Sequence, residues 1–144
     1  MVRHYLALPV EDLTAQQVAH YDRMWPAIVS LIERHTSDDV AGGLILESSG
    51  VWPDRVAGLA NADVAAVCLT AGNETLRARV HAASRFAELT GTDRILVDKF
   101  IGRTQRYDEL MVSAARRAGM LVVAADSFSS LATLVDKCWQ LLTG

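Results

Sequence analysis

Apolar residues recur at intervals of three and four along the first quarter of the chain. The stripe consists of Val18, Tyr21, Trp25, Ile28 and Ile32. This period predicts an amphipathic helix with one buried face. Thr14, followed three residues later by Gln17, has the pattern of a capping box and predicts that the helix starts there. Pro26 lies inside the stripe, so we expect a kink, because proline lacks the N–H that a helix interior needs.

Three short apolar runs, bounded by glycine or polar residues, have the length of buried strands. They cover residues 43–47, 64–70 and 120–125. Strands that are buried on both faces of a parallel sheet read as continuous apolar runs, so these segments predict three parallel strands. Helical patterns cover residues 53–59, a segment from Asn73, a segment from about 93 to 118, and residues 131–142. Strands that alternate with helices in this way indicate βαβ units and an α/β fold.

The composition fits one folded domain and narrows the possible functions. The chain has 144 residues, of which 51% are hydrophobic, and a formal net charge of −3. This charge favours neither a nucleic acid nor an anionic membrane as partner. The N-terminal sequence is not that of a signal peptide and no apolar run reaches membrane length, so we expect a cytoplasmic protein. Cys68 and Cys138 lack neighbouring ligands, so we expect reduced, buried thiols and no metal site.

Polar residues follow each expected strand at its carboxyl end, where open parallel sheets bind their ligands. Glu47 comes directly after the first run, and a carboxylate there could order metal-bound water or accept a proton. The alternative is that Glu47 only caps the following turn. Thr70 to Gly72 and Asp126 with Ser127 follow the other two runs. Glu47 is therefore the candidate catalytic residue.

Basic residues form two rows at helical spacing. One row is Arg77, His81 and Arg85, and the other is Lys99, Arg103 and Arg106. Residues three or four apart share a helix face, and a short turn at Gly91 would fold the two rows together. Converging guanidinium groups could clamp a polyphosphate. The candidate phosphate-binding residues are thus Arg77, Arg85, Arg103 and Arg106. The alternative is a solvated face on which these arginines pair with nearby carboxylates.

Several segments together resemble one known group of proteins. Leu-Ile-Leu-Glu-Ser-Ser-Gly-Val-Trp-Pro from Leu44 resembles the third strand of P-loop kinase-like proteins, and Ala-Val-Cys-Leu-Thr from Ala66 resembles their fourth. Residues 76–88 and 98–107 are similar to the helical lid with its arginines, and residues 122–126 to the last strand. Over nearly its whole length, the chain is therefore similar to small-molecule and nucleotide kinases and to zeta-toxin-like phosphotransferases.

The resemblance implies a fold, cofactors and roles for the candidate residues. The implied fold is a three-layer P-loop NTPase-like parallel sheet with a helix-rich lid. ATP and Mg²⁺ would be the cofactors, and a small molecule or nucleotide the ligand. The resemblance places Glu47 beside the metal and the acceptor, and the four candidate arginines in the lid.

The chain departs from this group at one decisive motif. No glycine is followed by lysine and then serine or threonine, so the Walker A loop is missing together with the first strand. We therefore expect an incomplete sheet and weak or no ATP binding by this chain alone. A second copy, or a partner that supplies the missing strand, would complete the sheet.

These observations predict one domain over residues 1–144. Its parts are acceptor-side helices at 1–40, a sheet core at 41–72, lid helices at 73–119, and the last strand and helix at 120–144. The predicted function is a portion of an ATP-dependent small-molecule phosphotransferase that is inactive as an isolated chain. The alternatives are a non-catalytic anion- or nucleotide-binding module, or a subunit of a split or domain-swapped enzyme.

Overall fold

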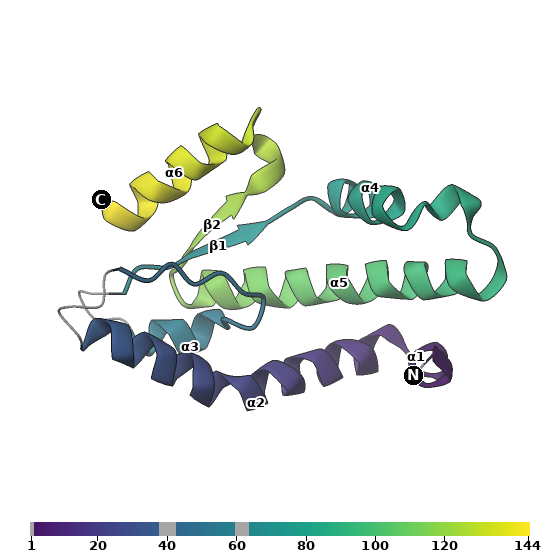
Figure 1. The fold of residues 1–144 in the computed structure, drawn as a ribbon, viewed down its shortest axis with the longest axis horizontal. Helices are drawn as coiled ribbons and strands as arrows, with labels where there is room; N and C mark the ends of the chain where they lie inside the picture. The colour runs from purple at the N-terminus through teal and green to yellow at the C-terminus, as the bar shows by residue number, and fades with distance from the viewer. Residues whose placement is uncertain (1, 38–42, 60–63) are drawn as a thin grey trace.

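The computed structural model describes residues 2–37, 43–59 and 64–144. Residues 1, 38–42 and 60–63, which belong to the expected acceptor-side helices and sheet core, lie outside the described residues. In chain order the elements are α1 (Val2–Ala7), α2 (Val10–Thr36), α3 (Pro53–Ala57), β1 (Val67–Thr70), α4 (Asn73–Ser84), η1 (Phe86–Glu88), α5 (Gly91–Arg117), β2 (Leu121–Ala124), η2 (Ala125–Ser127) and α6 (Leu131–Thr143). Figure 1 shows α5 running along the molecule, with α1, α2 and α3 on one side and α4, the strands and α6 on the other.

The expected three-layer P-loop-type sheet is wrong. Within the described ranges the sheet has two parallel strands, paired in register from Val67 with Leu121 to Thr70 with Ala124. Helices make up 72% of the described residues, so the fold is mostly helical. Residues 43–47 form neither strand nor helix, and Ile45 in that run is 83% exposed. An apolar run favours burial but does not determine which strand it pairs with. Without a neighbouring strand, its backbone N–H and C=O groups cannot form the hydrogen bonds of a sheet.

The long helix α5 organises the rest of the fold. It packs against α1, α2, α3, α4 and both strands. Its buried side chains are Ile101, Tyr107, Ala114 and Ala115. The two alanines are fully buried, and their small methyl groups allow close approach of the elements that pack on α5. The predicted extent of this helix, from about 93 to 118, is confirmed, and Gly119 follows it with a φ of 68°.

Helix α2 starts earlier than its sequence pattern suggested. It begins at Val10, so the predicted capping box at Thr14 is wrong. Thr14 instead lies buried in the first turns of the helix, where its hydroxyl donates to the Val10 carbonyl at 2.8 Å. Pro26 lies inside α2, as expected, and Figure 1 shows the axis of α2 changing direction near its middle. In the part of the chain that the structure describes, no helix is both long and apolar enough to span a membrane.

Candidate functional site

The carboxyl ends of β1 and β2 lie side by side, and acidic side chains gather there. Asp126, just after β2, accepts hydrogen bonds from the Gly72 N–H at 2.8 Å and from the Thr75 hydroxyl at 3.0 Å. Gly72 is the N-cap of α4, so this carboxylate lies at the positive end of the helix dipole. The Gly72 N–H, followed by the Thr75 hydroxyl, holds the pKa of Asp126 below its ordinary value. The place where an incoming phosphate would meet α4 is thus filled by the chain's own carboxylate.

A second carboxylate lies against β1. Asp108 of α5 accepts a hydrogen bond from the Thr70 hydroxyl at 2.6 Å. Burial, and then the charge of Asp108, raise the pKa of the Cys68 thiol. Cys68 and Cys138 are free cysteines; the expected burial of Cys68 is confirmed, whereas Cys138 is only half-buried. Among the residues described, no group of three or more His, Cys, Asp or Glu side chains could hold a metal ion.

Glu47 is exposed in the segment that leads into an anchored turn. The Tyr107 hydroxyl donates to the Ser49 carbonyl, and the Tyr21 hydroxyl lies 2.7 Å from Ser49 Oγ. Burial, and then the charges of Tyr21 and Asp22, raise the pKa of Tyr107, so its hydroxyl remains a donor. The turn after Glu47 is therefore tied to α2 and α5.

The four candidate arginines do not gather in one place. Three of them lie near carboxylates, as the solvated-face alternative described. These pairs are Arg77 with Asp98 at 4.0 Å, Arg85 with Glu88 at 3.6 Å, and Arg106 with Glu109 at 2.8 Å. The Gln105 amide donates to the Asn73 carbonyl, so this part of α5 lies beside the start of α4, whereas Arg85 follows its end. Twelve helical residues, roughly 18 Å, separate the two places.

Two members of the second basic row, Lys99 and Arg103, hold α1. The Lys99 ammonium donates to the carbonyls of Tyr5, Leu6 and Leu8. The Arg103 guanidinium lies 5.7 Å from the Tyr5 ring centroid and 5.0 Å from that of Phe100. The side chains that the sequence suggested as anion ligands here are therefore engaged in packing one helix on another.

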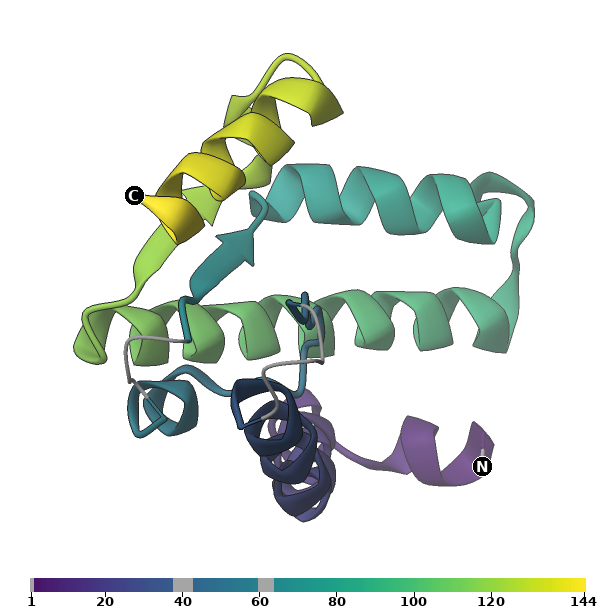
Figure 2. The same ribbon diagram turned by 60° about the vertical axis from the view of Figure 1, so that its left-hand side comes forward.

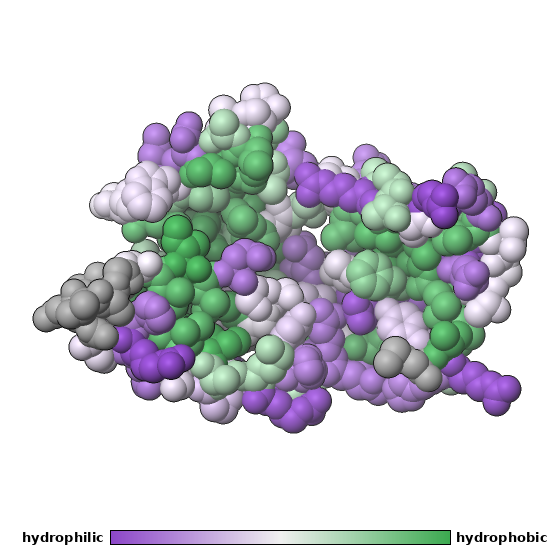
Figure 3. Space-filling model, in the orientation of Figure 1, coloured by the Kyte–Doolittle hydropathy of each residue, from purple (hydrophilic) through white to green (hydrophobic). Residues whose placement is uncertain are grey.

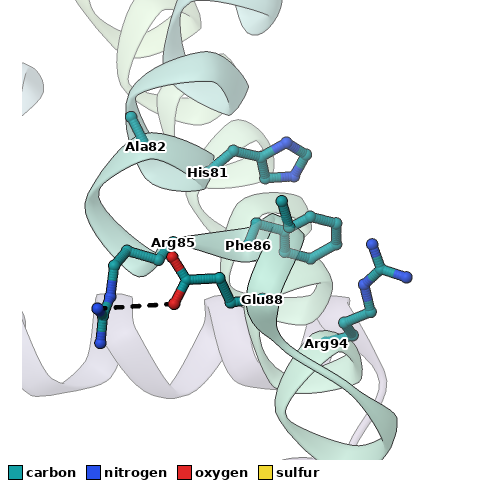
Figure 4. Close-up of a pocket in the computed structure, with 7 residues that line it drawn as sticks. His81, Ala82, Arg85, Phe86, Glu88 and Arg94 are labelled. Atoms are coloured by element: carbon teal, nitrogen blue, oxygen red, sulfur yellow. Dashed lines mark ion pairs between the residues drawn. The ribbon is translucent and has the colours of Figure 1, made fainter.

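An open recess of about 430 Å³ lies where the chain turns from α4 into α5 (Figure 4). Its lining residues are His81, Ala82, Arg85, Phe86, Ala87, Glu88 and Arg94. The recess exists because α4 ends at Ser84, earlier than its sequence pattern suggested. Arg85 takes the left-handed conformation, with a φ of 51°, and the chain then forms η1. Gly91, with a φ of 50°, starts α5 in a conformation that glycine adopts without strain.

The aromatic ring of Phe86 holds two other side chains in the recess. The His81 imidazole lies parallel to it, with centroids 4.0 Å apart and an interplanar angle of 6°. An imidazole at that distance covers one face of the ring, which leaves the other face for the Arg94 guanidinium, 4.8 Å from the centroid. Figure 4 shows His81 and Arg94 on different sides of Phe86. The stack fixes the Arg94 guanidinium at the recess.

Sequence spacing found His81 and Arg85 but missed Phe86 and Arg94. The helical pattern placed the segment after Ser84 in a continuous helix, which would have pointed Phe86 away from His81. The left-handed residue Arg85 reverses the chain and brings the two rings together. Gly91 was the only visible signal of a turn in this segment.

Positive charge is concentrated in the hairpin that carries this recess. Residues 73–106 hold seven Arg or Lys and four Asp or Glu, although the whole chain has a net charge of −3. Comparison of the chain with known protein families, with curated proteins and with solved structures finds no match. The resemblance to P-loop kinase-like proteins stays a hypothesis, and so do the roles of Glu47 and the four arginines.

Proposed function

We propose that this chain is a non-catalytic anion-binding module whose ligand lies in the recess between α4 and α5. The stacked Arg94, which lines the same recess as Arg85, is the observation that supports this most directly. A guanidinium held against an aromatic ring has lost part of its freedom before any ligand arrives, so binding costs less entropy. Its N–H groups remain available for charge-assisted hydrogen bonds to an oxyanion.

Of the two activities that the sequence suggested, the proposed function includes anion binding and does not include phosphoryl transfer. A phosphotransferase would need Glu47 and the arginines to act on one ligand, whereas Arg85 follows the end of α4 and the part of α5 around Gln105 lies beside the start of α4. Of the four candidate arginines, Arg85 alone lines the recess. ATP and Mg²⁺ enter only through the resemblance to P-loop kinase-like proteins, and the expectation of weak or absent ATP binding stays a prediction.

The geometry of Phe86 favours a compact oxyanion over a nucleotide base. Bases are commonly held by stacking on an aromatic face, and both faces of Phe86 are covered, by His81 and Arg94. Glu88 also lines the recess and pairs with Arg85, so a ligand must carry enough charge to compete with a carboxylate. Pyrophosphate meets both conditions, because it is small and multiply charged.

Isothermal titration calorimetry with pyrophosphate tests the proposal. At constant ionic strength we expect a dissociation constant below about 1 mM, which corresponds to about −4 kcal/mol. Arg94→Gln should weaken binding by about 10- to 150-fold, the value of one charged hydrogen bond of about 1.5–3 kcal/mol. Arg116→Gln is the matched control, because it removes the same exposed charge from the far end of α5.

Two results would contradict the proposal. One is the absence of heat with pyrophosphate at millimolar concentration. The other is an equal loss of affinity in Arg94→Gln and Arg116→Gln, which would mean that the whole surface attracts anions without a defined site. Tripolyphosphate and ATP, titrated in the same buffer, should bind alike if the base makes no contact with the recess.

A further inference from the structure

The two faces of the small sheet are covered very differently. Side chains alternate between faces along a strand, and paired residues of parallel neighbours point the same way. Thr70 faces α5, because its hydroxyl donates to Asp108. Leu69 and Leu121 therefore lie on the opposite face, on the side of α6, and remain 48% and 52% exposed. Figure 2 shows α6 on the side of the strands away from α5.

Helix α6 covers this face only in part and presents a second apolar stripe of its own. Leu131, Val135 and Trp139 are spaced by four residues and so share one face of the helix. They are 75%, 55% and 60% exposed, and no residue of α6 is buried. Figure 3 shows hydrophobic residues around α6 and the strands. We call these residues, with Leu69 and Leu121, the α6 face.

The α6 face has the size of one side of a stable protein interface. At the exposed fractions above, these five residues together expose roughly 600 Å² of mostly apolar surface, and contiguous patches on monomeric proteins seldom exceed that area. A standard interface takes about 800 Å² from each partner, of which roughly 500 Å² is apolar. The exposed area is thus enough for a complete interface.

We propose that the α6 face binds the same face of a second copy of this chain about a two-fold axis. A two-fold interface must be complementary to itself, and an uncharged apolar stripe meets this condition. The charged residues of α6 are Asp136 and Lys137. At 100° per residue they project about 100° and 160° away from Val135, so contact through the stripe buries no charge.

The charge distribution favours this occupant over a lipid surface. Outside residues 73–106 the chain carries thirteen acidic and seven basic residues. Amphipathic helices that lie on membranes depend on basic residues to attract anionic lipids, and α6 has Lys137 alone. A second copy needs no such attraction.

Sedimentation equilibrium of the full chain between about 1 and 200 μM tests the proposal, and we expect a dimer. Val135→Glu should raise the dissociation constant at least about a hundredfold, since the two-fold axis places two unpaired carboxylates in the apolar contact. The matched control is Ile95→Glu, because Ile95 is 52% exposed on α5 and lies outside the α6 face. The control should leave the dimer unchanged.

Circular dichroism tests whether each variant is folded. If Val135→Glu does not fold, Leu131→Glu takes its place, because Leu131 is the most exposed residue of the stripe. A wild-type monomer at 200 μM overturns the proposal. So does equal dissociation of the Val135→Glu and Ile95→Glu variants. A wild-type monomer that sediments with phosphatidylglycerol vesicles also overturns it, and assigns the face to lipid.

Discussion

Lys99 offers a direct measurement of how α1 is held to the rest of the chain. Its ammonium donates to the carbonyls of Tyr5 at 3.4 Å, of Leu8 at 2.6 Å, and of Leu6. These carbonyls lie at the C-terminal end of α1, where a helix leaves its last acceptors unpaired and a cation is favourable. Helix α1 has no buried residue, and its other contacts include the Arg103 guanidinium on Tyr5 and an exposed hydrogen bond between His4 and Gln16. Lys99→Met keeps the apolar stem and removes all three donors.

The three hydrogen bonds of Lys99 set the expected loss in the free energy of unfolding. Hydrogen bonds to a charged group contribute about 1.5–3 kcal/mol each, so three give an upper bound of about 4.5–9 kcal/mol. The loss is smaller than this bound, because the freed carbonyls regain water and the wild-type lysine loses about 2 kcal/mol of side-chain entropy when it is held. We expect Lys99→Met to lower the free energy of unfolding by about 2–4 kcal/mol. For a domain of this size that corresponds to about 8–16 °C in Tm.

Urea denaturation and amide hydrogen exchange together measure this effect. If α1 separates before the rest of the fold unfolds, exchange in residues 3–8 should accelerate at least about 30-fold, while the global midpoint changes less. Lys137→Met is the control, because it removes an exposed lysine from α6.

Equal effects of Lys99→Met and Lys137→Met on stability and on exchange in α1 would refute this reasoning. The affinity for pyrophosphate provides a second check. If the ammonium is committed to α1, as the three contacts indicate, Lys99→Met should leave that affinity unchanged. A large loss would return Lys99 to the anion-binding row that its spacing suggested.

Two further substitutions test the packing around the turn and the strand ends. Gly50→Ala should lower the free energy of unfolding, measured in urea, by about 1–3 kcal/mol, because its new Cβ would lie 2.8 Å from the Tyr21 ring. Gly43→Ala, whose Cβ would have nothing within 4 Å, is the control, and an equal loss in both variants would contradict this reasoning. Asp126→Asn should lower Tm at pH 7, because a carboxylate with a lowered pKa stabilises the fold while it is charged. The difference should disappear at acidic pH, once the pH has fallen through the folded-state pKa, which lies below the ordinary value of 3.8. A difference in Tm between wild type and Asp126→Asn that stays undiminished as the pH is lowered until the carboxylate is protonated would show that the charge is not the cause.

Local sequence patterns predicted the elements whose determinants lie within a few residues of one another. The long helix that ends before Gly119, the start of α4 at Asn73 and the last helix from Leu131 are confirmed. The parallel strands β1 and β2 also lie within predicted runs. Helical period, terminal glycine and strand length are short-range properties, so each can be read without knowledge of the rest of the fold.

Strand pairing and helix packing determined the features that the sequence predicted wrongly. Residues 43–47 have the composition of a strand, but a strand forms only where another edge accepts its hydrogen bonds. Lys99 and Arg103 have the spacing of a lid, but they face α1, which their own helical pattern cannot reveal.

The candidate site divides in the same way. The sequence by itself placed His81 on a helix, but the spacing that also put Arg85 on that helix face does not apply, because Arg85 follows the end of α4 in the left-handed conformation. Only the tertiary structure brought Phe86 and Arg94 into one stack with His81, through the left-handed backbone at Arg85 and the reversal that follows. A single residue in an uncommon backbone region redirects everything after it, and its neighbours in sequence carry little information about that choice.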